Sequence, residues 1–240
     1  MNKLKSAVLY ECSTTFKAIC IFYAIQYIVI SVITLITVIA SGSFENVGIS
    51  GLEINSVIFA GIFGVLGFKE DFKMLIQNGF TRKYIFLSTL CMFIFMSAVM
   101  ALIDTITGQA LHLLSENYFG IFGFYYGYEN IFANWIWLAC VYILVLSLLY
   151  LTILIINRLG KMLSIYLGIA FFGIILIVIA LFNYVFSVET VNNIFDFLTK
   201  AMGFMADGSI NYIFPVLTFL SIAAILEIGA YLVIRRAQVR

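Results

Sequence analysis

Long runs of apolar residues, separated by short polar segments, dominate the pattern along this 240-residue chain. A helix needs roughly 20 apolar residues to cross the hydrocarbon core of a bilayer. The second run is shorter than the others and begins at residue 54 or already near Leu52. The pattern predicts an all-α membrane protein with six transmembrane helices, at residues 18–40, 54–68, 84–103, 132–155, 163–184 and 212–234.

Two further segments show helical periodicity without being long enough to span. An N-terminal interfacial helix is predicted over residues 3–16, with one apolar side made of Leu4, Val8, Leu9, Cys12 and Phe16. A second amphipathic helix is predicted over 189–202, before the sixth span, and its apolar residues recur at helical spacing: Val191, Ile194, Phe195, Leu198 and Met202. Ser187 or Thr190 is the expected cap of this outer helix, and Gly203 its expected end.

The basic residues predict which side of the membrane each connection occupies. All of them except Lys200 lie before the first span, between the second and third, between the fourth and fifth, or after the sixth. Basic residues in short connections mark the cytoplasmic side, so both termini are expected in the cytoplasm. Val38 and Ala40 resemble a signal-peptide cleavage site, but the apolar run is far longer than a signal core. We therefore expect the first helix to be retained.

Composition supports lipid as the solvent for one domain, residues 1–240. Apolar residues make up 64% of the chain and charged residues 10%, whereas a soluble domain carries about 25% charged residues. The apolar runs do not alternate with polar residues as the strands of a membrane barrel would. The net charge of +1 offers no argument for nucleic-acid binding. The four cysteines show no metal-binding spacing and are expected to act as small hydrophobes.

No motif for catalysis or nucleotide binding occurs. Gly160-Lys161 is followed by Met162 and lacks the preceding glycine of a phosphate-binding loop. His112 is the single histidine, so it has no histidine partner for a metal site or a triad. The sequence therefore predicts a protein that is not an enzyme and holds no cofactor of its own.

The segment between the second and third spans carries the most specific pattern. Asp71 can cap a short helix, in which Phe72, Leu75 and Ile76 share one face. Gly79 suits the left-handed conformation that ends a helix, and Thr81 can cap the third span. This segment is either a helix that transmits force from a partner or a simple hairpin at the membrane surface.

Residues 69–88, with the pattern Phe-x-x-Leu-Ile-Gln-Asn-Gly-x-Thr-Arg-Lys-x-x-Phe-Leu, resemble the first inner loop of small bacterial ATP-binding-cassette permeases of the type II exporter fold. The order of elements is similar over nearly the full chain. The resemblance implies a cytoplasmic coupling helix that docks on the ATPase, formed by Asp71, Phe72, Lys73, Leu75, Ile76, Gln77, Asn78 and Gly79. It also implies turns at Gly203 and Gly208 before the last span, because Pro215 is the only proline.

The same resemblance implies partners and a role. A separate cytosolic ATPase would bind ATP and Mg, and two permease subunits, identical or related, would form a dimer in the bacterial cell membrane. The expected cargo is amphipathic or lipid-like, such as a peptide, toxin or antibiotic, and the expected direction is export. Two alternatives stay open: a substrate-capture subunit, and an immunity or sensor protein that binds a peptide. The aromatic-rich segment 118–128 is either an interfacial belt, an outer gate or a docking surface.

Polar residues inside the spans are the remaining candidates. Glu227, within the sixth span, either pairs with a base or hydroxyl of a neighbouring helix or handles cargo or protons. The first span carries a polar set that either packs against other helices or lines a path: Tyr23, Gln26, Ser31, Thr34 and Thr37. The resemblance implies that the first and fifth spans meet across the dimer seam.

Overall fold

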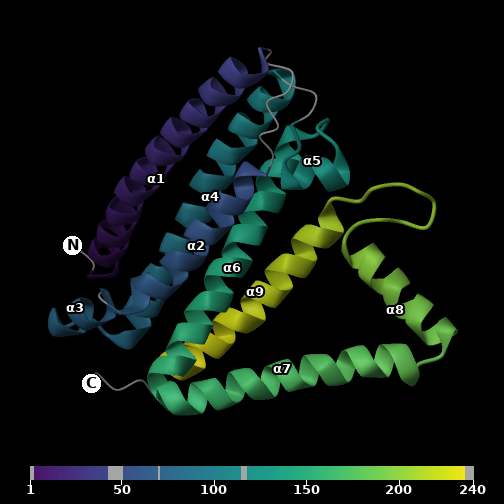
Figure 1. Ribbon diagram of the computed structural model, residues 1–240. Helices are drawn as coiled ribbons and strands as arrows, with labels where there is room; N and C mark the ends of the chain where they lie inside the picture. Colours follow the sequence, from purple (N-terminus) through teal and green to yellow (C-terminus); the bar gives the residue numbers. More distant parts are fainter. Residues whose placement is uncertain (1–2, 43–50, 70, 115–117, 236–240) are drawn as a thin grey trace.

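Helices make up nearly all of the chain that the structure describes (Figure 1). The computed structural model describes residues 3–42, 51–69, 71–114 and 118–235. The helices are α1 (Lys3–Ser41), α2 (Leu52–Lys69), α3 (Asp71–Gln77), α4 (Arg82–Leu114), α5 (Ile121–Tyr126), α6 (Ile131–Leu159), α7 (Lys161–Tyr184), α8 (Val188–Ala201) and α9 (Ile213–Ile234). These residues form no β-strand beyond one bridge between Phe204 and Ile210, so the predicted all-α class is confirmed.

Five of the described helices, α1, α4, α6, α7 and α9, are long and apolar enough to cross a membrane. The fold is therefore that of a multi-pass helical membrane protein. α2 is also apolar but shorter, and it begins at Leu52, the earlier of the two expected positions.

α6 is the central helix of the bundle and packs against α2, α4 and α9 (Figure 1). α1 lies along α4. α1 begins and α9 ends at the same end of the bundle as α3, whereas α5 lies at the opposite end. The bundle thus has two distinct ends, which we call the α3 end and the α5 end.

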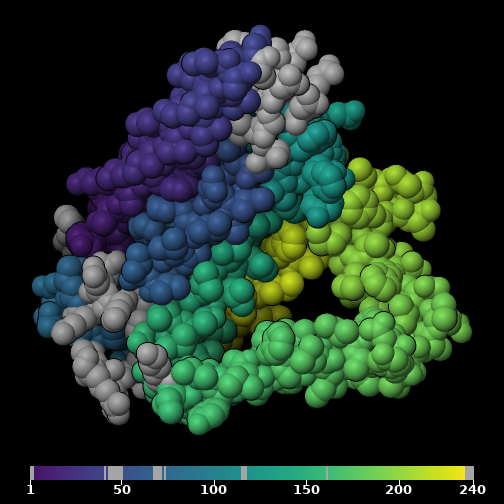
Figure 2. Space-filling view, in the orientation of Figure 1, coloured from purple at the N-terminus to yellow at the C-terminus, as the bar shows by residue number. Residues whose placement is uncertain are grey.

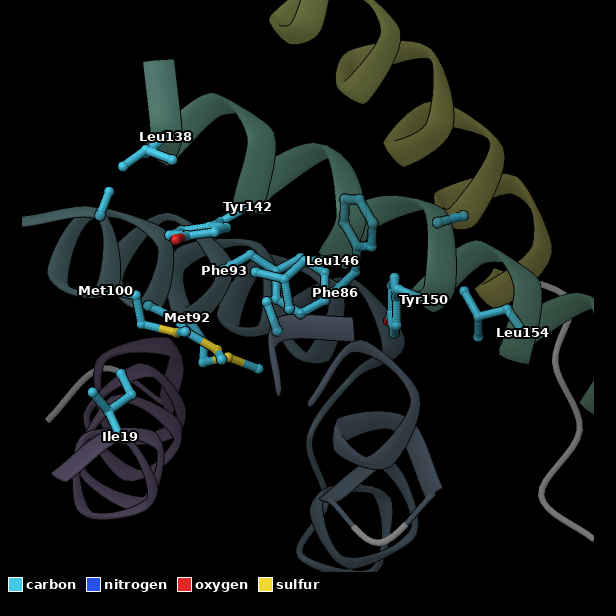
Figure 3. Close-up of a cluster of buried hydrophobic side chains, with 14 of the residues drawn as sticks. Ile19, Phe86, Met92, Phe93, Met100, Leu138, Tyr142, Leu146, Tyr150 and Leu154 are labelled. Carbon is cyan, nitrogen blue, oxygen red and sulfur yellow. The ribbon is translucent and has the colours of Figure 1, made fainter. Parts of the chain in front are cut away.

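The core is built on a row of every fourth residue of α6 (Figure 3). Residues four apart lie on one side of a helix and form a ridge that fits the groove of a neighbour. Phe93 of α4 meets Tyr150 edge-on, with 5.3 Å between ring centroids. The row is almost wholly buried and consists of Leu138, Tyr142, Leu146, Tyr150 and Leu154.

α2 approaches α6 closely because glycine leaves room for it. A Cβ at Gly64 would lie 2.9 Å from the backbone oxygen of Leu146. Small residues allow helix backbones to come together in membranes, where van der Waals packing holds helices against each other. Gly64 therefore sets how closely the shortest of the apolar helices packs against the central one.

α1 corrects one sequence expectation. It runs unbroken from Lys3 to Ser41, so the interfacial helix predicted over 3–16 is not a separate element. Leu9 and Phe16 of the predicted apolar face are 54% and 48% exposed, and a more polar row faces α4 instead. In a bilayer, apolar side chains can face lipid while polar ones need partners inside the bundle. Accordingly, Ser88 of α4 donates a 2.9 Å hydrogen bond to Glu11.

α4 is longer than expected and continues past residue 103 to Leu114. Asp104, which the sequence pattern placed at the outer end of the span, therefore lies inside a helix and is only 4% exposed. The Tyr142 hydroxyl of α6 donates a hydrogen bond to this carboxylate, which lowers the free-energy cost of burying it.

α7 and α8 stand away from the bundle, and Figure 2 shows an opening between α7 and the other helices. No residue described in α7 is buried, and its main contact is with α6. α8 leads back towards α9 through a turn with Gly203 and Gly208 at positive φ, so the expected glycine turns are present.

Candidate functional site

The short helix α3 forms where the sequence predicted a coupling helix. It ends at Gln77 and is followed by Gly79, which has φ +75°, and the Phe80 amide donates to the Leu75 carbonyl at 3.0 Å. This left-handed ending satisfies carbonyls of the last turn. Thr81 then starts α4, with its hydroxyl 3.4 Å from the Tyr84 amide. The predicted helix, its glycine end and the threonine cap are confirmed.

The apolar face of α3 is turned into the protein. Phe72 and Leu75 are 6% and 3% exposed and belong to the hydrophobic core, while Ile76 is half-buried. Gln77, Asn78 and Gly79 are exposed, and we call them the α3 rim. The side chains of Asp71 and Lys73 lie outside the described residues. A partner at α3 therefore meets the rim rather than the apolar face.

A buried polar cluster joins four helices on the side of the bundle nearer the α5 end. The Tyr142 hydroxyl of α6 donates to Asp104 Oδ2 of α4 at 2.5 Å. The hydroxyls of Tyr23 (α1) and Ser56 (α2) are 3.3 Å apart and lie close to the same carboxylate. We call Tyr23, Ser56, Asp104 and Tyr142 the Asp104 cluster. Three hydroxyls around one carboxylate hold it without a basic partner.

Sequence reasoning missed Asp104 as a site residue. A signal was present, because Asp104 lies four residues after Met100 and four before Gly108, on one side of the helix. All three residues are buried. Asp104 can therefore be recognised as a buried residue from its position on the packed side of α4, although it lies just beyond the predicted apolar run.

The polar residues predicted in the first span divide into two groups. Tyr23 also donates to the Met100 carbonyl at 3.2 Å, and Gln26 donates to the Leu52 carbonyl at 3.3 Å. Both side chains are buried and hydrogen-bonded across helices, which favours the helix-packing alternative. Ser31 and Thr37 bond the backbone of their own helix, and Thr34 is half-buried.

Glu53 is a second buried acid that the sequence analysis did not single out. It lies at the start of α2, is 3% exposed and hydrogen-bonds to the backbone of Ile121 at the start of α5. A Cβ at Gly120 would clash with its carboxylate. Burial, and then the nearby Glu53 carboxylate, raises the pKa of the Tyr118 hydroxyl, so that phenol stays protonated. Glu53 thus attaches α5 to α2.

Part of the aromatic segment forms a packed cluster at the α5 end. Tyr126 stacks on Phe204 with 5.4 Å between centroids, and its hydroxyl donates to the Met202 carbonyl at 2.6 Å. Phe122 and Tyr126 both pack edge-on against Trp137. These rings connect α5, α6 and the turn before α9, which makes them structural.

Three other aromatic side chains of this segment point outward, whereas Tyr118 is buried. Phe119, Phe124 and Tyr125 are 50%, 70% and 51% exposed. His112 stacks on Tyr128, with 3.7 Å between centroids. The expectation that His112 has no catalytic or metal-binding role stays a prediction, although no group of three or more potential ligands occurs in the described part of the chain.

Glu227 lies in a groove between α4, α6 and α9. The groove has a volume of about 450 Å³ and is lined almost entirely by apolar side chains. Ser147 of α6 is buried beside the carboxyl. Within the described chain, however, neither carboxyl oxygen of Glu227 has a hydrogen bond of good geometry. The hydroxyl neighbour expected from a nearby helix is therefore present as Ser147, but it makes no hydrogen bond of good geometry to the Glu227 carboxyl.

α8 forms where the sequence predicted an amphipathic helix before the last span. Its start is capped by Ser187, whose hydroxyl accepts from the Thr190 amide at 3.3 Å, and Gly203 follows its end at φ +90°. Phe195 and Leu198 are 55% and 50% exposed, while Val191, Ile194 and Met202 are half-buried. The apolar face is formed but not covered by the described chain.

Comparisons with protein-family models, with curated proteins and with solved structures give no match. The geometry of α3, the Asp104 cluster and the Glu227 groove therefore carries the functional argument.

Proposed function

We propose that this chain is the permease subunit of an ATP-driven exporter. The observation that supports this role most strongly is the attachment of α3 to the bundle. Phe72 and Leu75 anchor the helix in the core, and α3 packs against both α2 and α4. A helix held in this way moves together with its neighbours, so force applied to the α3 rim reaches two transmembrane helices at once.

The Asp104 cluster is where that movement would spread through the bundle. Ser56 on α2 and Asp104 on α4 meet Tyr23 of α1 and Tyr142 of α6. A partner ATPase, with ATP and Mg bound to its own residues, would press on α3 and shift α2 and α4. Only contacts that differ between two arrangements can drive such a shift, and in this proposal the buried hydrogen bonds of the Asp104 cluster would be such contacts.

In this proposal α1, α2, α4, α6, α7 and α9 are the six spans, and both termini are cytoplasmic. Lys3, Arg82, Arg158 and Arg235 all lie at helix ends at the α3 end of the bundle. Arg82 also donates to the Arg235 carbonyl at 3.0 Å. Basic residues favour the cytoplasmic surface, which supports a cytoplasmic position for α3.

The permease would act as a dimer, with an identical or a related subunit, in a bacterial plasma membrane. α7 has no buried residue among those described, so both lipid and a second subunit have access to it. The cargo would be amphipathic or lipid-like, such as a peptide, toxin or antibiotic, because many large apolar side chains are exposed on the long helices.

A second candidate function is peptide immunity or capture without an ATPase. It is favoured by the outward aromatic side chains of Phe119, Phe124 and Tyr125 at the α5 end. Aromatic rings with one exposed face bind apolar peptide side chains well. In that case the α3 rim would have no partner.

Co-purification with co-expressed ATP-binding subunits tests the proposal. The test variant is Gln77→Trp with Asn78→Trp, which blocks the exposed rim and leaves Phe72 and Leu75 in the core. The control is Asn192→Trp with Asn193→Trp, on exposed positions of α8. Trp is tolerated at both membrane surfaces.

We expect an ATPase to co-purify with the wild type and the α8 variant and to be lost from the rim variant. Membrane insertion should be equal in all three. If no ATPase accompanies the wild type, or if the rim variant retains it, the permease proposal is wrong and the immunity or capture function gains support.

A further inference from the structure

The Glu227 groove places one acid among apolar walls. Phe86, Leu90 and Phe93 of α4 line one side, and Ala224 and Tyr231 of α9 line another. The Ser147 and Tyr231 hydroxyls are the only other polar side-chain groups among the lining residues. The groove is thus a low-dielectric site that carries a single acidic side chain.

The acids elsewhere in the bundle differ from Glu227 in their hydrogen bonding. Asp104 accepts from Tyr142, and Glu11 accepts from Ser88. Both carboxyl oxygens of Glu227 are buried, and neither has a hydrogen bond of good geometry within the described chain, although Ser147 lies beside them. A carboxylate in apolar surroundings costs free energy until a cation or donors reach it. Glu227 is therefore the acid whose charge a ligand can best satisfy.

We propose that this groove binds a lipophilic monocation, with the positive charge beside Glu227 and the apolar body against α4 and α9. The volume of about 450 Å³ lies within the range of small-molecule sites. Phe86 and Tyr231 pack together with 5.2 Å between ring centroids, and aromatic faces attract cations further. An anion of the same shape should bind more weakly, because the Glu227 carboxylate repels it.

The outer part of the groove is accessible. Ile94 and Ile228 line it and are 51% and 62% exposed. A ligand that dissolves in the bilayer can therefore reach Glu227 from the side, between α4 and α9. This proposal deepens the proposed export function by naming a class of compound, but the binding step needs no ATPase. Its failure and the failure of the exporter role can be told apart.

The experiment is equilibrium binding of radiolabelled tetraphenylphosphonium to the purified full chain in detergent. Tetraphenylborate has the same shape with a negative charge and serves as the matched ligand. Glu227→Gln removes the charge of the site, and Glu189→Gln changes an exposed acid of α8 as the matched control. Ala224→Leu fills part of the groove while Glu227 remains.

We expect saturable binding of about one cation per chain to the wild type and to Glu189→Gln. Affinity should fall about tenfold or more in Glu227→Gln, which corresponds to roughly 1.4 kcal/mol, and should also fall in Ala224→Leu. Tetraphenylborate should bind no more weakly to Glu227→Gln than to the wild type.

Three results would overturn the site: no saturable cation binding to the wild type, equal affinity in Glu227→Gln, or wild-type binding of the anion as tight as that of the cation. Absence of binding to the wild type would mean that the groove is closed or that its acid is already satisfied by another group. If Glu227→Gln does not fold, Ala224→Leu tests the proposal instead. Unchanged affinity of that variant for tetraphenylphosphonium would show that the cation does not bind in the groove.

Discussion

The Tyr142 hydroxyl lies 2.5 Å from Asp104 Oδ2, across the interface between α6 and α4. Both side chains are buried, at 0% and 4% exposure. A carboxylate at this depth needs donors, and Tyr142 is the nearest of the three hydroxyls around it. This pair fixes the register of two long apolar helices that otherwise present similar surfaces along their length.

Tyr142→Phe should therefore destabilise the bundle by roughly 1–3 kcal/mol, because it leaves a buried carboxylate with fewer donors. The measurement is the free energy of unfolding in mixed detergent. Tyr27→Phe is the matched control, since Tyr27 bonds Thr107 at 2.7 Å but is 36% exposed. Equal losses in the two variants would contradict a special role for the buried pair.

Gly64→Ala should destabilise the protein by about 1–3 kcal/mol, because the added methyl group meets the backbone of α6 at Leu146, which cannot rotate away. Thermal unfolding in detergent provides the measurement. Gly168→Ala on α7 makes the same chemical change where nothing lies within 4 Å, and it should leave the melting temperature unchanged or slightly raised. A neutral Gly64→Ala would mean that α2 sits farther from α6.

Leu75→Ala should cost about 2–5 kcal/mol, since it opens a cavity beneath α3. Gln77→Ala, two residues away and exposed, should change stability by less than about 0.5 kcal/mol. Comparison of their denaturation midpoints tests which face of α3 is internal. An unchanged denaturation midpoint in Leu75→Ala would indicate that the apolar face of α3 is not packed in the core and is free to bind a partner.

Tyr126→Phe removes the hydrogen bond to the Met202 carbonyl and should cost roughly 1 kcal/mol, seen as a lower melting temperature. Tyr125→Phe, at an exposed ring, is the control. Burial raises the pKa of Tyr126, so the folded state favours the protonated phenol. The contribution of Tyr126 is therefore complete below its ordinary pKa of about 10 and declines as the pH rises above that value.

The difference in melting temperature between the wild type and Tyr126→Phe should consequently be constant from about pH 6 to 9 and shrink above about pH 10. A difference that grew at alkaline pH would mean that Tyr126 is ionised in the folded protein.

Features that depend on local sequence were predictable. Hydropathy located the long helices, and the glycines at 79 and 203 marked where α3 and α8 end, because few other residues adopt a positive φ. The cap of α8 by Ser187 was also predictable, because the hydroxyl bonds an amide only three residues along the chain. These features follow from a few neighbouring residues and do not depend on the rest of the fold.

Features that depend on contacts between distant helices were not predictable. Asp104 and Tyr142 are 38 positions apart, and nothing near Asp104 indicates its partner. The buried row of α6 and the exposed side of the same helix are both mostly apolar. Hydrophobic periodicity therefore does not show which side of α6 is packed. The prediction of a separate interfacial helix over 3–16 was wrong, because a more polar row, rather than the apolar one, packs inside the bundle.

None of the described residues of α7 is buried, and this has a consequence for the evolution of the sequence. A helix that meets mainly lipid has to remain apolar, but it does not require particular shapes. Where α7 faces lipid rather than the second subunit proposed above, exchanges among Leu, Ile, Val and Phe should therefore accumulate freely, whereas a change at Gly64 or Tyr142 disturbs a neighbouring helix. Kinship with this chain should be sought in the spacing of Ser56, Gly64, Asp104 and Tyr142 rather than in overall identity.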